Sequence, residues 1–176
     1  MSRLFVAVRP PEPVRKALQD AMGGIESVRW QDDDQLHLTL AFAGDVGDAQ
    51  AEDLIRSLAE IESMAFDAEV AGVGHFERKS VPTALWARVP LTEPLAQLQR
   101  RVDRACRRAG LTLEKRTYRP HITLAYLKRS AGAIGGWLAQ HGTLRAGPWE
   151  VGGFTLYESH LRAGGSLYQP LVDYEF

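Results

Sequence analysis

Two short strands with the same residue pattern constrain the fold of this chain more than any other feature. "LHLTLAFAG" covers residues 36–44 and "RPHITLAYL" covers residues 119–127, and both contain His-x-Thr-Leu. Side chains alternate between the two faces of a strand, so each His shares a face with its Thr while the adjacent aliphatic residues take the other face. Each strand is therefore expected to bury an apolar face and to present an imidazole beside a hydroxyl.

The segments around the two motifs follow a similar order in each half of the chain. In the first half, a strand and a helix with an apolar stripe precede the His-x-Thr strand. In the second half, Thr92 opens a helix that Gly110 closes, and the second His-x-Thr strand follows. The other expected elements are a strand over 3–9, helices over 12–22 and from Asp48, a strand pair over 66–76 and 84–90, a weak helix or loop over 131–142, and a final hairpin over 149–161 and 166–176.

This order predicts an α+β fold of two lobes related by a pseudo-twofold axis. Each lobe is expected to have a mainly antiparallel sheet and an outer helix, and the two polar strand faces would then line one central groove. We expect a single bilobal domain over 1–176, with its lobes centred on the motifs at 37–40 and 121–124.

The composition is that of an ordinary globular chain. Of its 176 residues, 45% are hydrophobic and 24% are charged, and the formal net charge is −1, which argues against a protein that coats long nucleic acids. Cys106 is the only cysteine, so we expect neither a disulfide nor a thiolate metal cluster. No apolar run of 18 residues and no signal peptide is present. We expect a cytoplasmic monomer with no membrane partner.

Chance and structural roles explain the repeated motif poorly. A lone His on a strand is most often a hydrogen-bonded structural residue, but five histidines in the chain make two copies of a four-residue pattern improbable. A metal site would need a third ligand, which neither motif supplies. The chain contains no G-x-S-x-G and no G-x-x-x-x-G-K-[ST] sequence. General acid–base catalysis by one protonated and one neutral imidazole remains, with no cofactor.

A phosphate is the substrate group that best fits the other polar residues. Thr39 and Thr123 can donate hydrogen bonds to its non-bridging oxygens. Basic side chains around the second motif could attract an anion, although a solvated charged face explains most of them equally well. These side chains are Lys115, Arg116, Arg119, Lys128 and Arg129.

The paired motifs resemble those of the two-histidine (2H) phosphoesterase superfamily. More narrowly, the chain is similar to the bacterial LigT-like RNA 2′,3′-cyclic phosphodiesterases, also called 2′-5′ RNA ligases. The resemblance includes the opening "RLFVAVRPP" and the ending "FTLYESHLRAGGSLYQPL" as well as both motifs. It implies a bilobal fold with a central groove, no metal or nucleotide requirement, and hydrolysis of a 2′,3′-cyclic phosphate to a 2′-phosphate. RNA ends or small 2′,3′-cyclic nucleotides are then the substrates.

The resemblance also implies the roles of the two histidines. His37 would be the proton donor to the departing 3′ oxygen, and His121 the proton acceptor that activates water. The residues by themselves do not distinguish the two imidazoles. Tyr126 departs from the family, whose members often carry Arg there, so Arg119, Lys128 or Arg129 would have to supply the charge. Phe42 could contact a base only if its strand bulges; strict alternation predicts that it lies in the core.

Two further functions stay open at this point. Ligation of a cyclic end to a 5′-hydroxyl is the reverse reaction, with RNA as the nucleophile, and hydrolysis is expected to dominate it. A non-catalytic module that binds RNA ends in the same groove is the alternative from a different class. Such a module would have no need of both imidazoles.

Overall fold

A computed structural model describes residues 1–176. The strands are β1 Ser2–Val8, β2 Arg29–Trp30, β3 Leu38–Val46, β4 Phe66–Ala71, β5 Val73–Arg78, β6 Val81–Arg88, β7 His121–Tyr126, β8 Arg145–Val151, β9 Gly153–Arg162 and β10 Gly165–Glu175. The helices are α1 Glu12–Asp20, α2 Asp48–Ala59, α3 Glu93–Arg108 and α4 Gly135–His141, with a short 3₁₀ helix, η1, at Asp33–Gln35. None of the four α-helices has the length and the apolar run needed to cross a bilayer.

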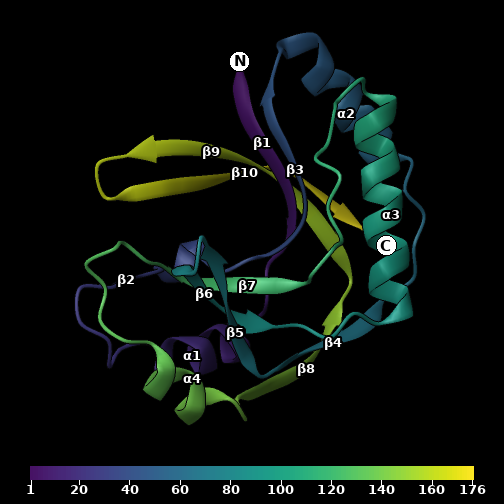
Figure 1. Ribbon diagram of the computed structural model, residues 1–176. Coiled ribbons are helices and arrows are strands. Elements are labelled where there is room, and N and C mark those ends of the chain that lie inside the picture. Colours follow the sequence, from purple (N-terminus) through teal and green to yellow (C-terminus); the bar gives the residue numbers. More distant parts are fainter.

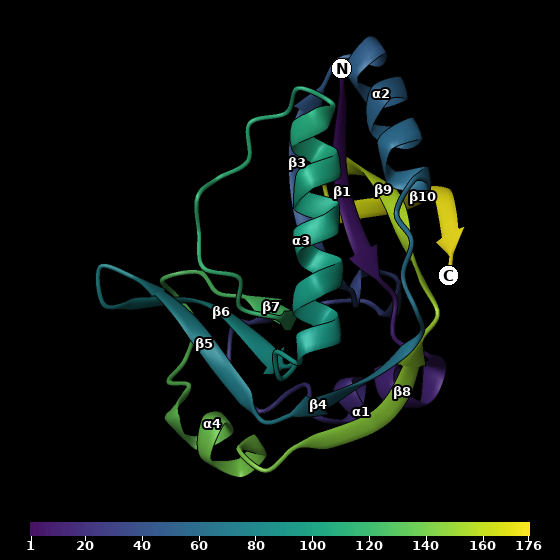
Figure 2. The same ribbon diagram turned by 90° about the vertical axis from the view of Figure 1, so that its right-hand side faces the viewer.

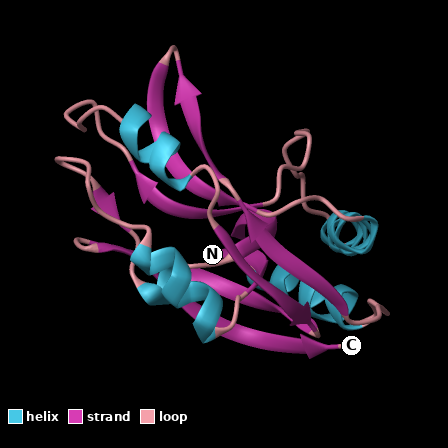
Figure 3. Cartoon of the chain, turned by 90° about the horizontal axis from the view of Figure 1, so that it is seen from below, coloured by secondary structure: helices cyan, strands magenta, loops and turns pink.

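The two motif strands lie side by side in the middle of one large sheet. Its strand order is β10-β9-β1-β3-β7-β6-β5, and β2 pairs with β7 beside this path. Every pairing is antiparallel, and β4 and β8 form a second antiparallel sheet. The sheet curves strongly, and the helices lie outside it (Figures 1 and 3). The predicted α+β class with antiparallel sheets and outer helices is confirmed.

Helix α3 shows how the sequence pattern produces this packing. Its apolar stripe is fully buried, and it consists of Leu95, Leu98, Val102 and Ala105. Burial of each leucine removes apolar surface from water and stabilises the fold by roughly 1.5–3 kcal/mol. The helix ends as expected at Gly110, whose φ of 79° fits a residue without a Cβ. Helices α3 and α2 run side by side, and α3 packs on β3, in front of it in Figure 2.

Both predicted hairpins are present, as β5–β6 and β9–β10. Two of the predicted strand boundaries were wrong. The segment 66–76 is two strands, because Gly72 (φ 91°) turns the chain between β4 and β5 and sends them to different sheets. Residues 149–151 belong to β8, which pairs with β4 and not with the final hairpin. That hairpin, β9–β10, forms around the predicted glycine turn.

Candidate active site

The four motif side chains lie side by side on a single face of the sheet. Strands β3 and β7 pair at one point, where Leu38 lies opposite Ile122. Extending this antiparallel register by one residue in each direction places His37 opposite Thr123, and Thr39 opposite His121. Opposite residues of an antiparallel pair point to the same face. Each imidazole therefore has a hydroxyl residue of the other motif beside it.

The neighbouring strands extend these two cross-strand pairs into rows. On β6, Arg88 lies opposite His121 and Trp86 lies opposite Thr123. On β1, Ala7 lies opposite Thr39, and one residue further along the register Arg9 lies beside His37. The two rows are Ala7-Thr39-His121-Arg88 and Arg9-His37-Thr123-Trp86. Read in opposite directions, both rows give Arg-His-Thr, as a pseudo-twofold axis through the Leu38–Ile122 pair requires.

His37 is buried in an aromatic cage. Its residue surface is only 5% exposed, and neither ring nitrogen has a hydrogen-bond partner. The ring makes edge contacts with Tyr157, Tyr168 and Phe5, at centroid distances of 4.6, 5.5 and 6.1 Å. Desolvation lowers the pKa of His37 from 6.5 to about 4, although the nearby Gln35 carbonyl, which is outside hydrogen-bond geometry, raises it slightly. The neutral ring is therefore favoured in the empty site at neutral pH.

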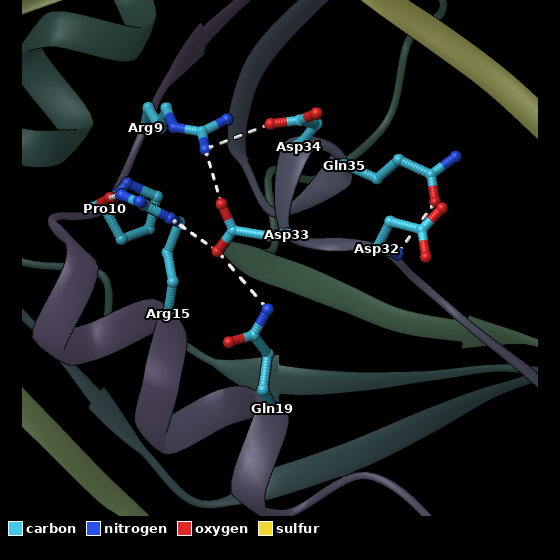
Figure 4. A network of polar contacts seen from close by, with 8 residues as sticks. All are labelled: Arg9, Pro10, Arg15, Gln19, Asp32, Asp33, Asp34 and Gln35. Carbon is cyan, nitrogen blue, oxygen red and sulfur yellow. Dashed lines mark hydrogen bonds and ion pairs between the residues drawn. The ribbon is translucent and has the colours of Figure 1, made fainter.

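A polar network fixes the turn that leads into His37 (Figure 4). Asp33 accepts hydrogen bonds from Arg9 and from Arg15 of α1, both at 2.9 Å, and from Gln19 at 3.3 Å. Gln35 accepts from the Asp32 N–H at 3.0 Å and donates to the Ser166 carbonyl of the β9–β10 hairpin at 2.8 Å. Half-exposed ion pairs of this kind contribute little free energy, about 0–1 kcal/mol each. Their effect is to tie β1, α1 and the hairpin to the η1 turn.

His121 is held differently. Its Nδ1 lies 2.6 Å from the Arg119 carbonyl, and because a carbonyl can only accept, the proton is on Nδ1 in the neutral ring. Nε2 then carries the free lone pair. Phe76 and Trp86 pack against the ring at centroid distances of 5.0 and 5.8 Å. Partial burial lowers the pKa of His121 below its ordinary value, while the Arg119 hydrogen bond opposes this.

The expectation that Phe42 lies in the core was wrong. Its residue surface is 69% exposed. Leu40 has no partner on β1, because Ala7 pairs with Thr39 and Val6 pairs with Ala41. This bulge adds one residue to β3 and shifts the alternation, so the side chain of Phe42 lies on the His37 face. Its ring centroid lies 6.1 Å from that of Phe5.

The second motif contains the same bulge at the equivalent residue. Leu124 has no partner on β6, because Trp86 pairs with Thr123 and Leu85 pairs with Ala125. Tyr126 therefore lies on the His121 face and is 59% exposed, although strict alternation placed it on the opposite face. Both motifs thus carry an exposed aromatic side chain on the face of the two histidines, five residues after the histidine.

The predicted basic residues are not gathered at the histidines. Arg119, Lys128 and Arg129 are all exposed, and Arg119 contacts the site through its backbone carbonyl. Lys128 and Arg129 line a hollow of about 240 Å³ between the start of β6 and the segment after β7. Nowhere in the structure do three His, Cys, Asp or Glu side chains gather to hold a metal ion.

Several contact residues of the two imidazoles were missed from the sequence. Tyr168 contacts His37, and Trp86 contacts His121. The residues with no sequence signal of their own are Phe5, Tyr157, Phe76, Arg9 and Arg88. The strand period of two could have placed Phe5 and Arg9 on one face of β1, but only the pairing partners show that this face is that of His37.

Comparison with known proteins supplies the family. A family model described as the 2′-5′ RNA ligase superfamily matches residues 6–162. The chain belongs to the 2′-5′ RNA ligase superfamily.

Named relatives and solved structures of this superfamily agree over nearly the whole chain. The RNA 2′,3′-cyclic phosphodiesterase of Archaeoglobus fulgidus is 27% identical over 98% of this chain and 99% of its own length, and that of Thermus thermophilus is 32% identical over 96% and 87%. The crystal structure of TT0787 of Thermus thermophilus superposes with a TM-score of 0.78 at 25% identity, covering 98% of this chain and 97% of the other. E. coli LigT complexed with 3′-AMP, at 24% identity, shows the same fold with a TM-score of 0.77 over 99% and 98%. The predicted family is confirmed, and the chain is an enzyme of the 2′-5′ RNA ligase superfamily.

The buried His37 should make this enzyme less stable in mild acid. Its pKa is 6.5 when unfolded and about 4 when folded, so the unfolded chain binds more protons between these values. The contribution of His37 to the free energy of unfolding is therefore retained above pH 6.5. It falls by about 3 kcal/mol as the pH drops toward 4. Urea unfolding of the wild type and of His37→Asn at pH 7 and pH 4.5 measures this loss of unfolding free energy. A variant whose loss of stability equals that of the wild type would contradict the burial argument.

Gly74→Ala should disturb the contact between Trp86 and His121. Gly74 lies opposite Trp86 in the β5–β6 pair, and an added Cβ would come within 2.6 Å of Trp86 Cζ2. We expect overpacking to lower the free energy of unfolding by about 1–3 kcal/mol. In a Trp86→Leu background the same change should cost much less, because the ring is gone. Equal costs in the two backgrounds, in a double-mutant cycle by urea unfolding, would show that the indole is not the obstacle.

Proposed function

We propose that this enzyme hydrolyses the 2′,3′-cyclic phosphate of an RNA end or a small cyclic nucleotide to a 2′-phosphate by two-histidine acid–base catalysis. The observation that carries the proposal is the cross-strand register that sets His37 beside Thr123 and Thr39 beside His121 on one face. In-line displacement at phosphorus needs a proton donor and a proton acceptor on opposite flanks of the phosphate, and two histidines on adjacent strands supply them. The relatives named RNA 2′,3′-cyclic phosphodiesterase support the same substrate.

His121 is the proton acceptor in this scheme. The Arg119 carbonyl keeps the proton on Nδ1, which leaves Nε2 as a base for the attacking water. As Nε2 takes up the proton, the imidazolium keeps its hydrogen bond to the carbonyl and is stabilised by it. No change in ring orientation is needed between the two protonation states.

His37 is the proton donor to the departing 3′ oxygen. Its ring is neutral in the empty site at neutral pH, so it has to acquire a proton when substrate binds. A phosphate anion beside the ring favours the imidazolium and raises the pKa. Neither buried ring nitrogen has a hydrogen-bond partner within the protein, so each is left for a group of the substrate.

Thr39 and Thr123 donate hydrogen bonds to the non-bridging phosphate oxygens. Each contributes on the order of 10²-fold in rate at most, because a single donor to a developing charge is worth a few kcal/mol. Phe42 and Tyr126, which the two bulges place on the catalytic face, provide exposed rings on which a base can stack. Arg119, Lys128 and Arg129 are exposed and not gathered at the histidines, so their positive charge acts only by attracting the anion over a longer range.

The reverse reaction, 2′-5′ ligation, uses the same groups with a 5′-hydroxyl in place of water. Binding of the second RNA strand would have to outweigh the high concentration of water, so hydrolysis dominates. We propose that the enzyme acts as a cytoplasmic monomer. The lone Cys106 is a buried free thiol in α3, which suits a reducing compartment.

Leaving-group dependence tests the two proton roles. His37→Ala should lose about 10²–10⁴-fold in kcat/KM on a 2′,3′-cyclic mononucleotide but far less on a nitrophenyl phosphodiester, whose leaving group departs without a proton. His121→Ala should be impaired on both substrates, since water still needs its base. The assays are run in EDTA, with circular dichroism to check the fold of each variant.

Two outcomes would contradict this assignment. Rescue of His121→Ala, and not of His37→Ala, by the nitrophenyl substrate would reverse the roles. A wild-type enzyme that binds cyclic nucleotides in EDTA without turnover would be a binding module or a metallohydrolase.

The pH optimum of kcat/KM should lie below that of kcat. The former reports the free enzyme, in which burial lowers the pKa of both histidines below 6.5. The kcat profile reports the substrate complex, in which the phosphate anion raises the pKa of both histidines. The bell-shaped profile of kcat therefore moves to higher pH. Full profiles on a 2′,3′-cyclic mononucleotide measure both, and coincident optima would argue against protonation of His37 by substrate binding.

A further inference from the structure

A hollow on the side of the sheet covered by α3, away from the face of the two histidines, is strongly basic. It has a volume of about 510 Å³ and lies between α3 and the segment 111–120, which arches away from the helix (Figure 2). The side chains that line it include Arg100, Arg104, Arg107, Lys115 and Arg116, with Asp103 and Glu114 as the only acids. We call it the α3 groove.

The α3 groove concentrates positive charge in a chain that is acidic overall. Its lining carries a formal charge of +3, whereas the whole chain carries −1. Arginines on α3 face Lys115 and Arg116 on the opposite wall, and like charges around a hollow repel one another. An anion between the two walls would relieve this repulsion.

Two of the five cations are free to bind such an anion. Arg100, Arg107 and Arg116 form ion pairs with neighbouring carboxylates. Arg104 and Lys115 are exposed and have no carboxylate partner. They stand on opposite walls, so a chain of phosphates lying along the groove can contact both.

The far wall of the groove is joined to both catalytic strands. Tyr118 lines the groove, and its hydroxyl donates to the Thr39 carbonyl at 2.9 Å. Gln99, on α3, donates to the Leu40 carbonyl at 3.4 Å. The next residue after Tyr118 is Arg119, whose carbonyl holds His121. The segment 111–120 therefore connects the α3 groove to both motif strands, by the Tyr118 hydrogen bond to β3 and by the chain itself to β7.

We propose that the α3 groove binds the phosphodiester backbone of an RNA strand whose cyclic end occupies the active site. The proposal rests on the proposed function and specifies its substrate as an oligonucleotide. A small hollow lined by arginine and lysine, with one aromatic ring, fits a flexible single-stranded backbone and reads no base sequence. A mononucleotide ends at its own ribose and would gain nothing from this groove.

The test removes the two free cations together. Arg104→Gln/Lys115→Gln is assayed on a 2′,3′-cyclic mononucleotide and on a series of single-stranded RNA oligonucleotides with 2′,3′-cyclic ends. We expect unchanged kcat/KM on the mononucleotide and a loss on the longer oligonucleotides. Each lost phosphate contact reduces the salt slope of binding by about 0.7. When the salt is lowered from 200 to 50 mM, oligonucleotide binding should therefore strengthen about sevenfold more in the wild type than in the variant, which has lost two contacts.

A matched control removes the same charge elsewhere. Lys16→Gln/Arg145→Gln alters exposed cations on α1 and β8, and it should leave the ratio of oligonucleotide to mononucleotide activity as in the wild type. Equal activity of the wild type on all lengths, or an equal loss in the groove variant on mononucleotide and oligonucleotides, would overturn the proposal. Absence of any wild-type turnover of the mononucleotide would instead count against the proposed function.

Discussion

The candidate active site depends on the single pairing between Leu38 and Ile122. These two residues are the only point at which the central strands β3 and β7 are in register, and both are fully buried. An antiparallel pair fixes the neighbours on either side, so this contact decides that each histidine lies opposite the threonine of the other motif. A shift of either strand by one residue would turn the His and Thr of that strand to the core face. The apolar residues of the motifs thus position the polar ones.

Much of this arrangement could be predicted from the sequence, because alternation is a local property. His37 with Thr39, and His121 with Thr123, share a face for reasons contained in three residues. The buried stripe of α3 and the glycine at its end are equally local. Phe42 and Tyr126 could not be placed in the same way. Their faces depend on the bulges at Leu40 and Leu124, and a bulge is defined by the partner strand, which lies far away in the sequence.

The two imidazoles also differ for reasons that lie outside their own motifs. His121 owes its tautomer to the carbonyl of Arg119, two residues earlier. His37 owes its low pKa to rings from β1, β9 and β10, which come from both ends of the chain. Identical motifs therefore give two different acids. The pseudo-twofold axis relates the residues, and the surroundings break the symmetry of their chemistry.

This broken symmetry suits a reaction whose two proton transfers are different. A base must be unprotonated and oriented before substrate arrives. Burial lowers the pKa of His121 and favours its neutral ring, and the hydrogen bond from Nδ1 to the Arg119 carbonyl orients it. An acid that is neutral until an anion binds would transfer no proton in the empty site, and the desolvated His37 has this property. The same burial makes the imidazolium a stronger acid once the phosphate has charged it, because the dry cage of Phe5, Tyr157 and Tyr168 disfavours the cation that proton transfer removes.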